Sequence, residues 1–178
     1  MELREERVSS KTIFEGKIIK VTLDEARLPD GKLANREVCY HPGGVAILAL
    51  DEDSTVYLVQ QYRYPIDKIL LELPAGKLEG DEDHKLAAAR ELSEETGLDA
   101  DEFTYLGYTL ASPGFCDEAL HMYLARGLHR KEQHLDEDEF LNVVTMPFAQ
   151  LAEKCMSGEI TDAKTVTTTL KVKTLLGL

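Results

Sequence analysis

Three glutamates crowd into five residues of a segment that reads as one helix. Glu91, Glu94 and Glu95 belong to the stretch "GKLEGDEDHKLAAARELSEETGL", which runs from Gly76 to Leu98. Like charges three and four residues apart on a helix repel one another mildly. Either water screens them on a solvated face, or a positive charge sits among them. Carboxylates are hard oxygen ligands that suit Mg²⁺ or Mn²⁺, so the second reading predicts a divalent-metal site.

A helix expected from about residue 81 to residue 96 must position these acids. Asp81 or Asp83 would cap its start, and Gly97 would end it. At about 100° per residue the acids share one face, and the core is expected on the opposite side. The preceding "LPAGKLEG" contains a proline and two glycines, which can bring backbone carbonyls close to the same ion. The core-facing side is expected to consist of Leu86, Ala89 and Leu92.

The remaining elements mix strands and helices without regular alternation. This order favours an α/β (α+β) fold, in which helices cover a mixed sheet, over a doubly wound parallel sheet. A hairpin is expected at residues 17–41, turning at Asp30-Gly31. Further strands are expected at 43–51, 55–64, 68–76, 101–112, 118–128 and 139–148, and further helices at 146–160 and 161–178.

Composition limits the classes of partner. The chain has 178 residues and is expected to form one domain over residues 1–178. Its formal net charge of −13 argues against a nucleic-acid polymer, because no basic stripe could neutralise phosphates. A small anionic substrate needs an accompanying cation. The first residues, "MELREERVSSK", contain no apolar signal-peptide core, and no apolar run is long enough to cross a membrane. Three widely spaced cysteines fit free thiols in a cytoplasmic protein.

The spacing of the acidic stretch resembles the Nudix box, and every fixed position matches. The resemblance implies an α/β/α sandwich with a mixed sheet, and hydrolysis of nucleoside diphosphates linked to another group. It also implies an N-terminal antiparallel hairpin within residues 1–42. The box covers 23 of the 178 residues. Its fixed positions are Gly76, Glu82, Arg90, Glu91, Glu94, Glu95 and Gly97.

The same resemblance implies a set of metal ligands. Glu91 and Glu95 would be the main ligands of Mg²⁺, with Mn²⁺ as the alternative ion. Glu94 would assist directly or through water. The backbone carbonyl of Ala75 would complete the coordination.

The resemblance also implies roles in catalysis beside the metal. Arg90 would pair with Glu82 and hold the loop and the helix in register. In the family a loop glutamate reaches the metal site and takes a proton from water. Glu139, in "DEDEF", matches this position best, with Glu137 as the fallback, and the alternative is a solvated acidic loop.

Four further stretches, "QQYRY", "LELPAGKLE", "SPGFCDE" and "DEDEF", resemble the ADP-ribose pyrophosphatase branch of the family. With the box they extend the resemblance over about residues 36 to 140. In that branch Arg63 would contact the pyrophosphate and Arg36 would be a second substrate-facing arginine, since an arginine fork suits phosphate oxygens. For either arginine the alternative is an ordinary surface position at a strand end. The residues expected to bind substrate are Arg36, Arg63, Glu72, Ser112, Gly114 and Glu118.

The resulting hypothesis is Mg²⁺-dependent hydrolysis of ADP-ribose, or of a related nucleoside diphosphate sugar, to a nucleoside monophosphate and a sugar phosphate. One alternative is a Nudix hydrolase of dinucleoside polyphosphates or nucleoside triphosphates. Another is a non-catalytic nucleotide-sensing module on the same fold. By resemblance alone, the protein would be a homodimer that exchanges N-terminal strands.

Overall fold

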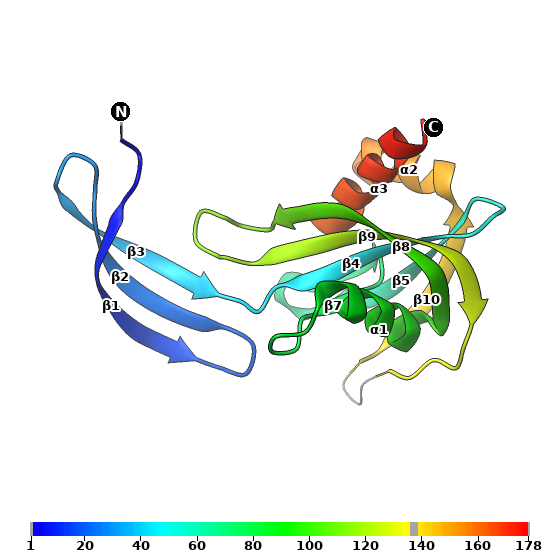
Figure 1. Ribbon diagram of the computed structural model, residues 1–178, viewed down its shortest axis with the longest axis horizontal. Coiled ribbons are helices and arrows are strands. Elements are labelled where there is room, and N and C mark those ends of the chain that lie inside the picture. The colour runs from blue at the N-terminus through cyan, green and yellow to red at the C-terminus, as the bar shows by residue number, and fades with distance from the viewer. Residues whose placement is uncertain (1, 136–138, 178) are drawn as a thin grey trace. The chain divides into compact units, whose positions relative to one another are not determined.

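The computed structural model describes residues 2–135 and 139–177, and it divides into two compact units (Figure 1). The smaller unit contains residues 1–43 and 110–119. The larger unit contains residues 44–109 and 120–178. The single domain expected over residues 1–178 stays a prediction.

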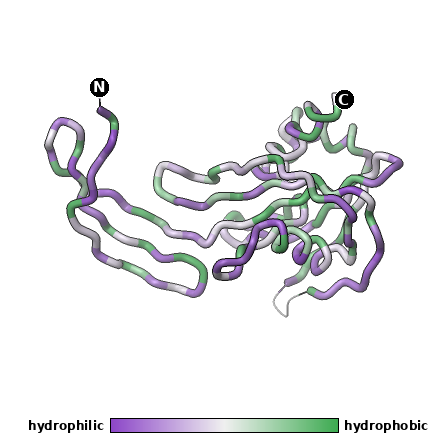
Figure 2. The backbone as a smooth tube through the Cα atoms, in the orientation of Figure 1, coloured by the Kyte–Doolittle hydropathy of each residue, from purple (hydrophilic) through white to green (hydrophobic). Residues whose placement is uncertain are grey.

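A three-stranded antiparallel sheet forms most of the smaller unit, in the order β1-β2-β3. The expected hairpin is β2 (Lys20–Arg27) and β3 (Leu33–Tyr40), and Gly31 adopts a φ of 87° in its turn. β1 (Glu6–Glu15) pairs with β2 and was not located from sequence. Every β1 residue is exposed, so no burial pattern marks this strand, and hydrophilic and hydrophobic residues are mixed along the sheet (Figure 2).

A seven-stranded mixed sheet is the centre of the larger unit. Its order is β10-β5-β4-β9-β8, with β6 beside β5 and β7 beside β4. β4 and β9 run parallel, whereas β5 is antiparallel to β4, β6 and β10. The sheet therefore confirms the predicted mixed topology. Its strands are β4 (Gly44–Leu50), β5 (Thr55–Arg63), β6 (Lys68–Glu72), β7 (Ala75–Lys77), β8 (Leu98–Leu110), β9 (Ala119–Arg130) and β10 (Leu141–Pro147).

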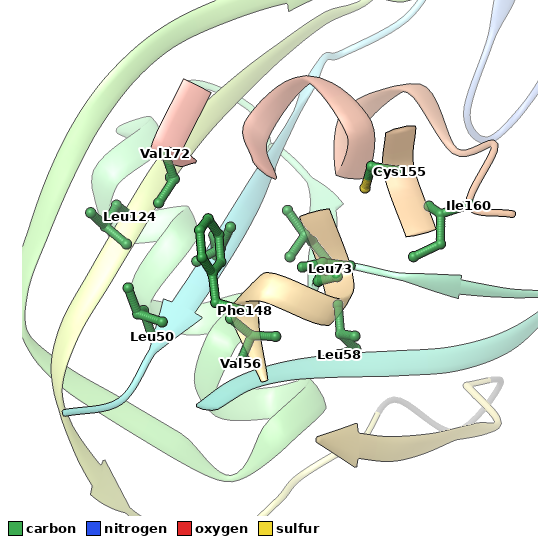
Figure 3. Close-up of a cluster of buried hydrophobic side chains, with 11 residues drawn as sticks. Leu50, Val56, Leu58, Leu73, Leu124, Phe148, Cys155, Ile160 and Val172 are labelled. Carbon is green, nitrogen blue, oxygen red and sulfur yellow. The ribbon is translucent and has the colours of Figure 1, made fainter. Parts of the chain in front are cut away.

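The central strand β4 supplies side chains to two separate hydrophobic cores. Because successive side chains of a strand point to opposite faces, Ile47 belongs to one core and Leu48 to the other. The first core lies against α1 (His84–Thr96). The second lies against α2 (Phe148–Ser157) and α3 (Ala163–Leu176), where the labelled side chains of Figure 3 gather around Phe148.

The larger unit is therefore a sheet between helices, as predicted, with α1 on one face and α2 and α3 on the other (Figure 1). A short 3₁₀ helix, η1 (Tyr64–Ile66), joins β5 to β6. α3 forms despite its run of threonines, because several of its threonines and Val172 are buried. No helix within residues 2–135 and 139–177 has the length and apolar character needed to cross a membrane.

Candidate active site

Two acids of α1 lie on its buried face, so the expected separation of an acid face from a core face was wrong, although the predicted burial of Leu92 is confirmed. Glu91 and Glu95 are buried together with Ala87, Ala88 and Leu92, whereas Leu86 is 67 % exposed. The two alanines are small enough to let this face approach the sheet. The caps are as predicted: the Asp83 carboxylate accepts from the first backbone N–H groups of the helix, and Gly97 ends it at a φ of 64°.

A glycine allows the chain before α1 to pass directly against these acids. A Cβ atom at Gly76 would lie 2.0 Å from Cδ and Oε1 of Glu91, so any other residue here would displace the Glu91 carboxylate. The backbone N–H of Ala75 donates to Oε2 of Glu95 at 2.9 Å. Ala75 and Gly76 both belong to β7, which pairs with β4. The sheet thus fixes the backbone of β7 against the two carboxylates.

Arg90 supplies a positive charge among the acids. Its Nη1 donates to Oε1 of Glu91 at 2.8 Å and to Oε2 of Glu94 at 2.9 Å. Its Nε and Nη2 donate to the two carboxylate oxygens of Glu82 at 3.1 and 2.9 Å. The expected contact between Arg90 and Glu82 is therefore present. A further bond from Nη2 to the Lys77 carbonyl ties the loop to the helix.

The positive charge of Arg90 does not offset the effect of burial on the pKa values of Glu91 and Glu95. Burial raises the pKa of Glu91 to about 7, although Arg90 opposes the shift. Burial raises the pKa of Glu95 to about 8, although the Ala75 N–H opposes it. The negative charge of Glu139 also raises both pKa values. Within the described ranges, no three acidic, histidine or cysteine side chains are arranged to hold a metal ion.

Backbone contacts direct the chain after β9 along the end of α1. This segment is hydrophilic (Figure 2). The N–H of Lys131 donates to the Gly97 carbonyl at 2.7 Å, and the side-chain amide of Gln133 donates to the Glu95 carbonyl at 2.5 Å. These bonds hold residues 131–133 against the end of α1. Glu137, the fallback residue, lies outside the described residues.

Arg63 and Glu72 form a bidentate ion pair. Nε and Nη2 of Arg63 donate to the Glu72 oxygens at 2.8 and 2.6 Å. The Glu72 side chain is fully buried, and Lys164 also donates to it. Two-fifths of the Arg63 side chain remains exposed. The predicted substrate contacts of both residues stay predictions. Lys164 was missed, because "TDAKT" reads as an ordinary capped helix start.

The other residues predicted to bind substrate belong to the smaller unit. Arg36 donates to both carboxylate oxygens of Glu5 at 2.9 and 2.6 Å. The expected turn is present, since the N–H groups of Phe115 and Cys116 donate to the Ser112 carbonyl. Gly114 lies within this turn, and Glu118 follows it with a carboxylate oxygen 3.5 Å from Nδ1 of His41. Their roles also stay predictions.

Comparison with protein families matches almost the whole chain. The model of the NUDIX domain matches residues 40–167. The model of the nucleoside diphosphate sugar hydrolase N-terminal domain matches residues 5–39. The chain therefore belongs to the NUDIX domain family.

Several curated proteins are similar over nearly the full length. ADP-ribose pyrophosphatase of Bacillus subtilis is 39 % identical over 165 residues, which cover 92 % of this chain and 89 % of that protein. Methanol dehydrogenase activator of Bacillus methanolicus is 40 % identical over 164 residues, which cover 91 % and 89 %. GDP-mannose pyrophosphatase of Cronobacter sakazakii is 34 % identical and covers 93 % of each chain.

A solved structure shares the fold. The crystal structure of an ADP compounds hydrolase superposes with a TM-score of 0.86 at 21 % identity, covering 99 % of this chain and 97 % of the other.

Proposed function

We propose that the protein hydrolyses the pyrophosphate bond of ADP-ribose or a related nucleoside diphosphate sugar, with a divalent metal ion as cofactor. The products would be a nucleoside monophosphate and a sugar phosphate. The observation that carries the proposal is the buried acid pair, Glu91 and Glu95, packed against the backbone of Ala75 and Gly76. The names of the pyrophosphatase relatives support the substrate class.

The residues around the acid pair fit a divalent cation. Their donor atoms are oxygens, as Mg²⁺ and Mn²⁺ prefer. The pKa of Glu91 and of Glu95 lies above the usual range, so a bound cation would stabilise their charged forms. We therefore assign Glu91 and Glu95 as main ligands, with Glu94 and the Ala75 carbonyl assisting. Mg²⁺ bound there would neutralise diphosphate charge and acidify a bound water.

The protein's own groups would complete the reaction. Glu139, whose charge acts on both Glu91 and Glu95, would accept the proton of the attacking water as a general base. Arg63 would donate to the diphosphate oxygens with the part of its guanidinium that Glu72 leaves free. Arg90 would hold Glu82, Glu91 and Glu94 in place rather than touch the substrate.

We further propose a cytoplasmic homodimer that uses the smaller unit. Its first strand carries exposed large apolar side chains, among them Val8, Ile13 and Phe14. Exposed apolar clusters of this kind are typical of protein interfaces. A dimer mass in light scattering would support this assignment, and a monomer mass would contradict it.

A substrate panel with product identification tests the proposed activity. ADP-ribose, GDP-mannose, ADP-glucose, ATP and a diadenosine polyphosphate are each incubated with Mg²⁺, with Mn²⁺ or with a chelator. We expect AMP and ribose 5-phosphate from ADP-ribose, or the corresponding pair from another nucleotide sugar, only when metal is present. Turnover of ATP or the polyphosphate alone, or of nothing, would contradict the proposal.

A further inference from the structure

Lys164 is the only lysine or arginine among the described residues that is buried, with 7 % of its surface exposed. It lies in the first turn of α3, far along the sequence from the acidic helix. Burying an ammonium group is unfavourable unless it is paired and hydrogen-bonded. Its partners therefore indicate what the side chain does.

Two carboxylates surround the ammonium group of Lys164. Its Nζ donates to Oε2 of Glu72 and, at 3.0 Å, to Oδ1 of Asp162. Glu72 in turn accepts from Nε and Nη2 of Arg63. Lys164, Glu72 and Arg63 thus form a continuous chain of alternating charges. Among the described residues, Nη1 of Arg63 has no hydrogen-bond partner, so one edge of the guanidinium is free.

The charge of Glu72 depends on both of its cations. Burial pushes the pKa of Glu72 upward, but Arg63 and Lys164 outweigh this effect and hold the pKa below its usual value. If Arg63 were the only partner, a phosphate group that attracts Arg63 would weaken the support of a fully buried carboxylate. Lys164 provides a second cation that no substrate would reach, since it is buried.

The start of α3 also holds the backbone next to Glu72. Oγ1 of Thr165 accepts from the N–H of Leu73 at 2.9 Å and donates to Oδ2 of Asp162 at 2.6 Å. The Glu72 backbone therefore cannot shift without breaking these bonds. The side chain of Glu72 and the backbone of Leu73 are thus both anchored to the start of α3.

We propose that Lys164 is a positioning residue that acts through Glu72 on Arg63. It keeps the buried carboxylate in place and charged, so that Arg63 presents its free edge in one orientation to the diphosphate of the substrate. An arginine fork held on one side loses less freedom when it binds phosphate. This inference rests on the proposed function, in which Arg63 binds the diphosphate.

Lys164→Met, which removes the charge at similar volume, tests the proposal against Lys171→Met. Lys171 lies on the same helix, is exposed and donates to the Leu106 carbonyl instead of a carboxylate. Calorimetry with α,β-methylene ADP-ribose, whose bridge cannot be cleaved, gives Kd without turnover. We expect Lys164→Met to raise this Kd, and KM for ADP-ribose, by about tenfold while kcat changes much less. Lys171→Met should match the wild type.

A double-mutant cycle separates positioning from a general structural effect. If Lys164 acts through Glu72, then Lys164→Met added to Glu72→Gln should change Kd by less than about twofold. The proposal would be overturned if the increase in Kd of the double variant equalled the product of the two single increases. Wild-type values of Kd and KM in Lys164→Met would also overturn it. Should Lys164→Met fail to fold, Lys164→Gln, which keeps an amide donor without charge, takes its place under the same expectation.

The two hypotheses fail in different ways. A wild type that binds the uncleavable analogue but does not hydrolyse ADP-ribose would contradict the proposed activity, and the Kd comparison would still decide the role of Lys164. A wild type that hydrolyses ADP-ribose, with Lys164→Met equal to Lys171→Met in Kd and KM, would contradict only the role of Lys164.

Discussion

Two clusters of charged side chains lie in the larger unit, and they differ in how their charges are compensated. The Arg90 cluster consists of Glu82, Arg90, Glu91, Glu94 and Glu95. Arg90 donates to three of these four acids, and Glu95 accepts from the backbone N–H of Ala75 instead. The Arg63 chain consists of Arg63, Glu72, Asp162 and Lys164, so two acids meet two cations.

Each cluster contains a buried glutamate, and the pKa values of the two are shifted in opposite directions. Glu72 is fully buried, yet its pKa is lowered, because Arg63 and Lys164 both bind it. Glu95 is almost as buried, and its pKa rises to about 8. Burial alone therefore does not decide the shift. Arg63 and Lys164 donate to Glu72, whereas Glu95 accepts from a neutral backbone N–H and feels the negative charge of Glu91. The Arg90 cluster lacks positive charge in the amount that a divalent ion would provide.

The largest expected effect comes from removing one acid of the Arg90 cluster. Glu95→Gln should lower kcat on the order of a thousandfold, since a main metal ligand loses its charge. Steady-state kinetics with saturating Mg²⁺ measures this loss. Glu153→Gln, an exposed acid on α2, is the matched control and should remain fully active. Near-normal turnover of Glu95→Gln would refute the assignment.

Neutralising one glutamate in each cluster should change stability in opposite directions. Glu72→Gln should lower the free energy of unfolding by about 3 kcal/mol, because it leaves the buried Lys164 and the partly exposed Arg63 without their shared carboxylate. Glu95→Gln should raise it by about 1 kcal/mol in metal-free protein at pH 8, since a poorly compensated acid is removed. Urea denaturation with a chelator measures both changes. Changes of the same sign would contradict the comparison.

A smaller effect should appear in the pH dependence of metal-free stability. Glu91 and Glu95 have folded pKa values of about 7 and about 8, above the ordinary glutamate value of 4.5. Between pH 4.5 and these values the folded state therefore binds more protons than the unfolded state. The stability that these two groups contribute to the folded state is complete below pH 4.5 and is lost as the pH rises toward 8. The slope is about 1.4 kcal/mol per pH unit for each proton.

The pKa of His121 is lowered below 6.5, so this group makes stability rise with pH at lower pH values. Denaturation is therefore measured between pH 6.5 and pH 8.5, where the two glutamates dominate. Stability in chelator should fall with pH across this range, and Glu95→Gln should show a shallower fall. If stability fell with pH at the same slope in the wild type and in Glu95→Gln, Glu95 would not be the source of the pH dependence.

Local sequence signals predicted much of the fold and part of the site. The apolar run of β4, the Asp83 and Gly97 caps and the Arg90–Glu82 contact all depend on residues within one element or between neighbours. The buried face of α1 was assigned wrongly, since an apolar residue, Leu86, was assumed to mark the core.

What sequence could not predict depends on contacts between distant segments. Lys164 reaches Glu72 across 92 positions, and nothing in either segment signals the pairing. β1 has no buried side to produce a hydrophobic pattern. Gly76 matched the motif, but the reason for a glycine there is visible only where the Glu91 carboxylate lies against its backbone.

Binding of Mn²⁺ to the metal-free protein, followed by electron paramagnetic resonance, tests the central claim most directly. The claim is that the uncompensated acids of α1 hold a divalent ion. We predict that the wild type and Glu72→Gln bind Mn²⁺ with similar affinity, and that Glu95→Gln binds it at least about tenfold more weakly. Equal Mn²⁺ affinity in the wild type and Glu95→Gln would contradict the account.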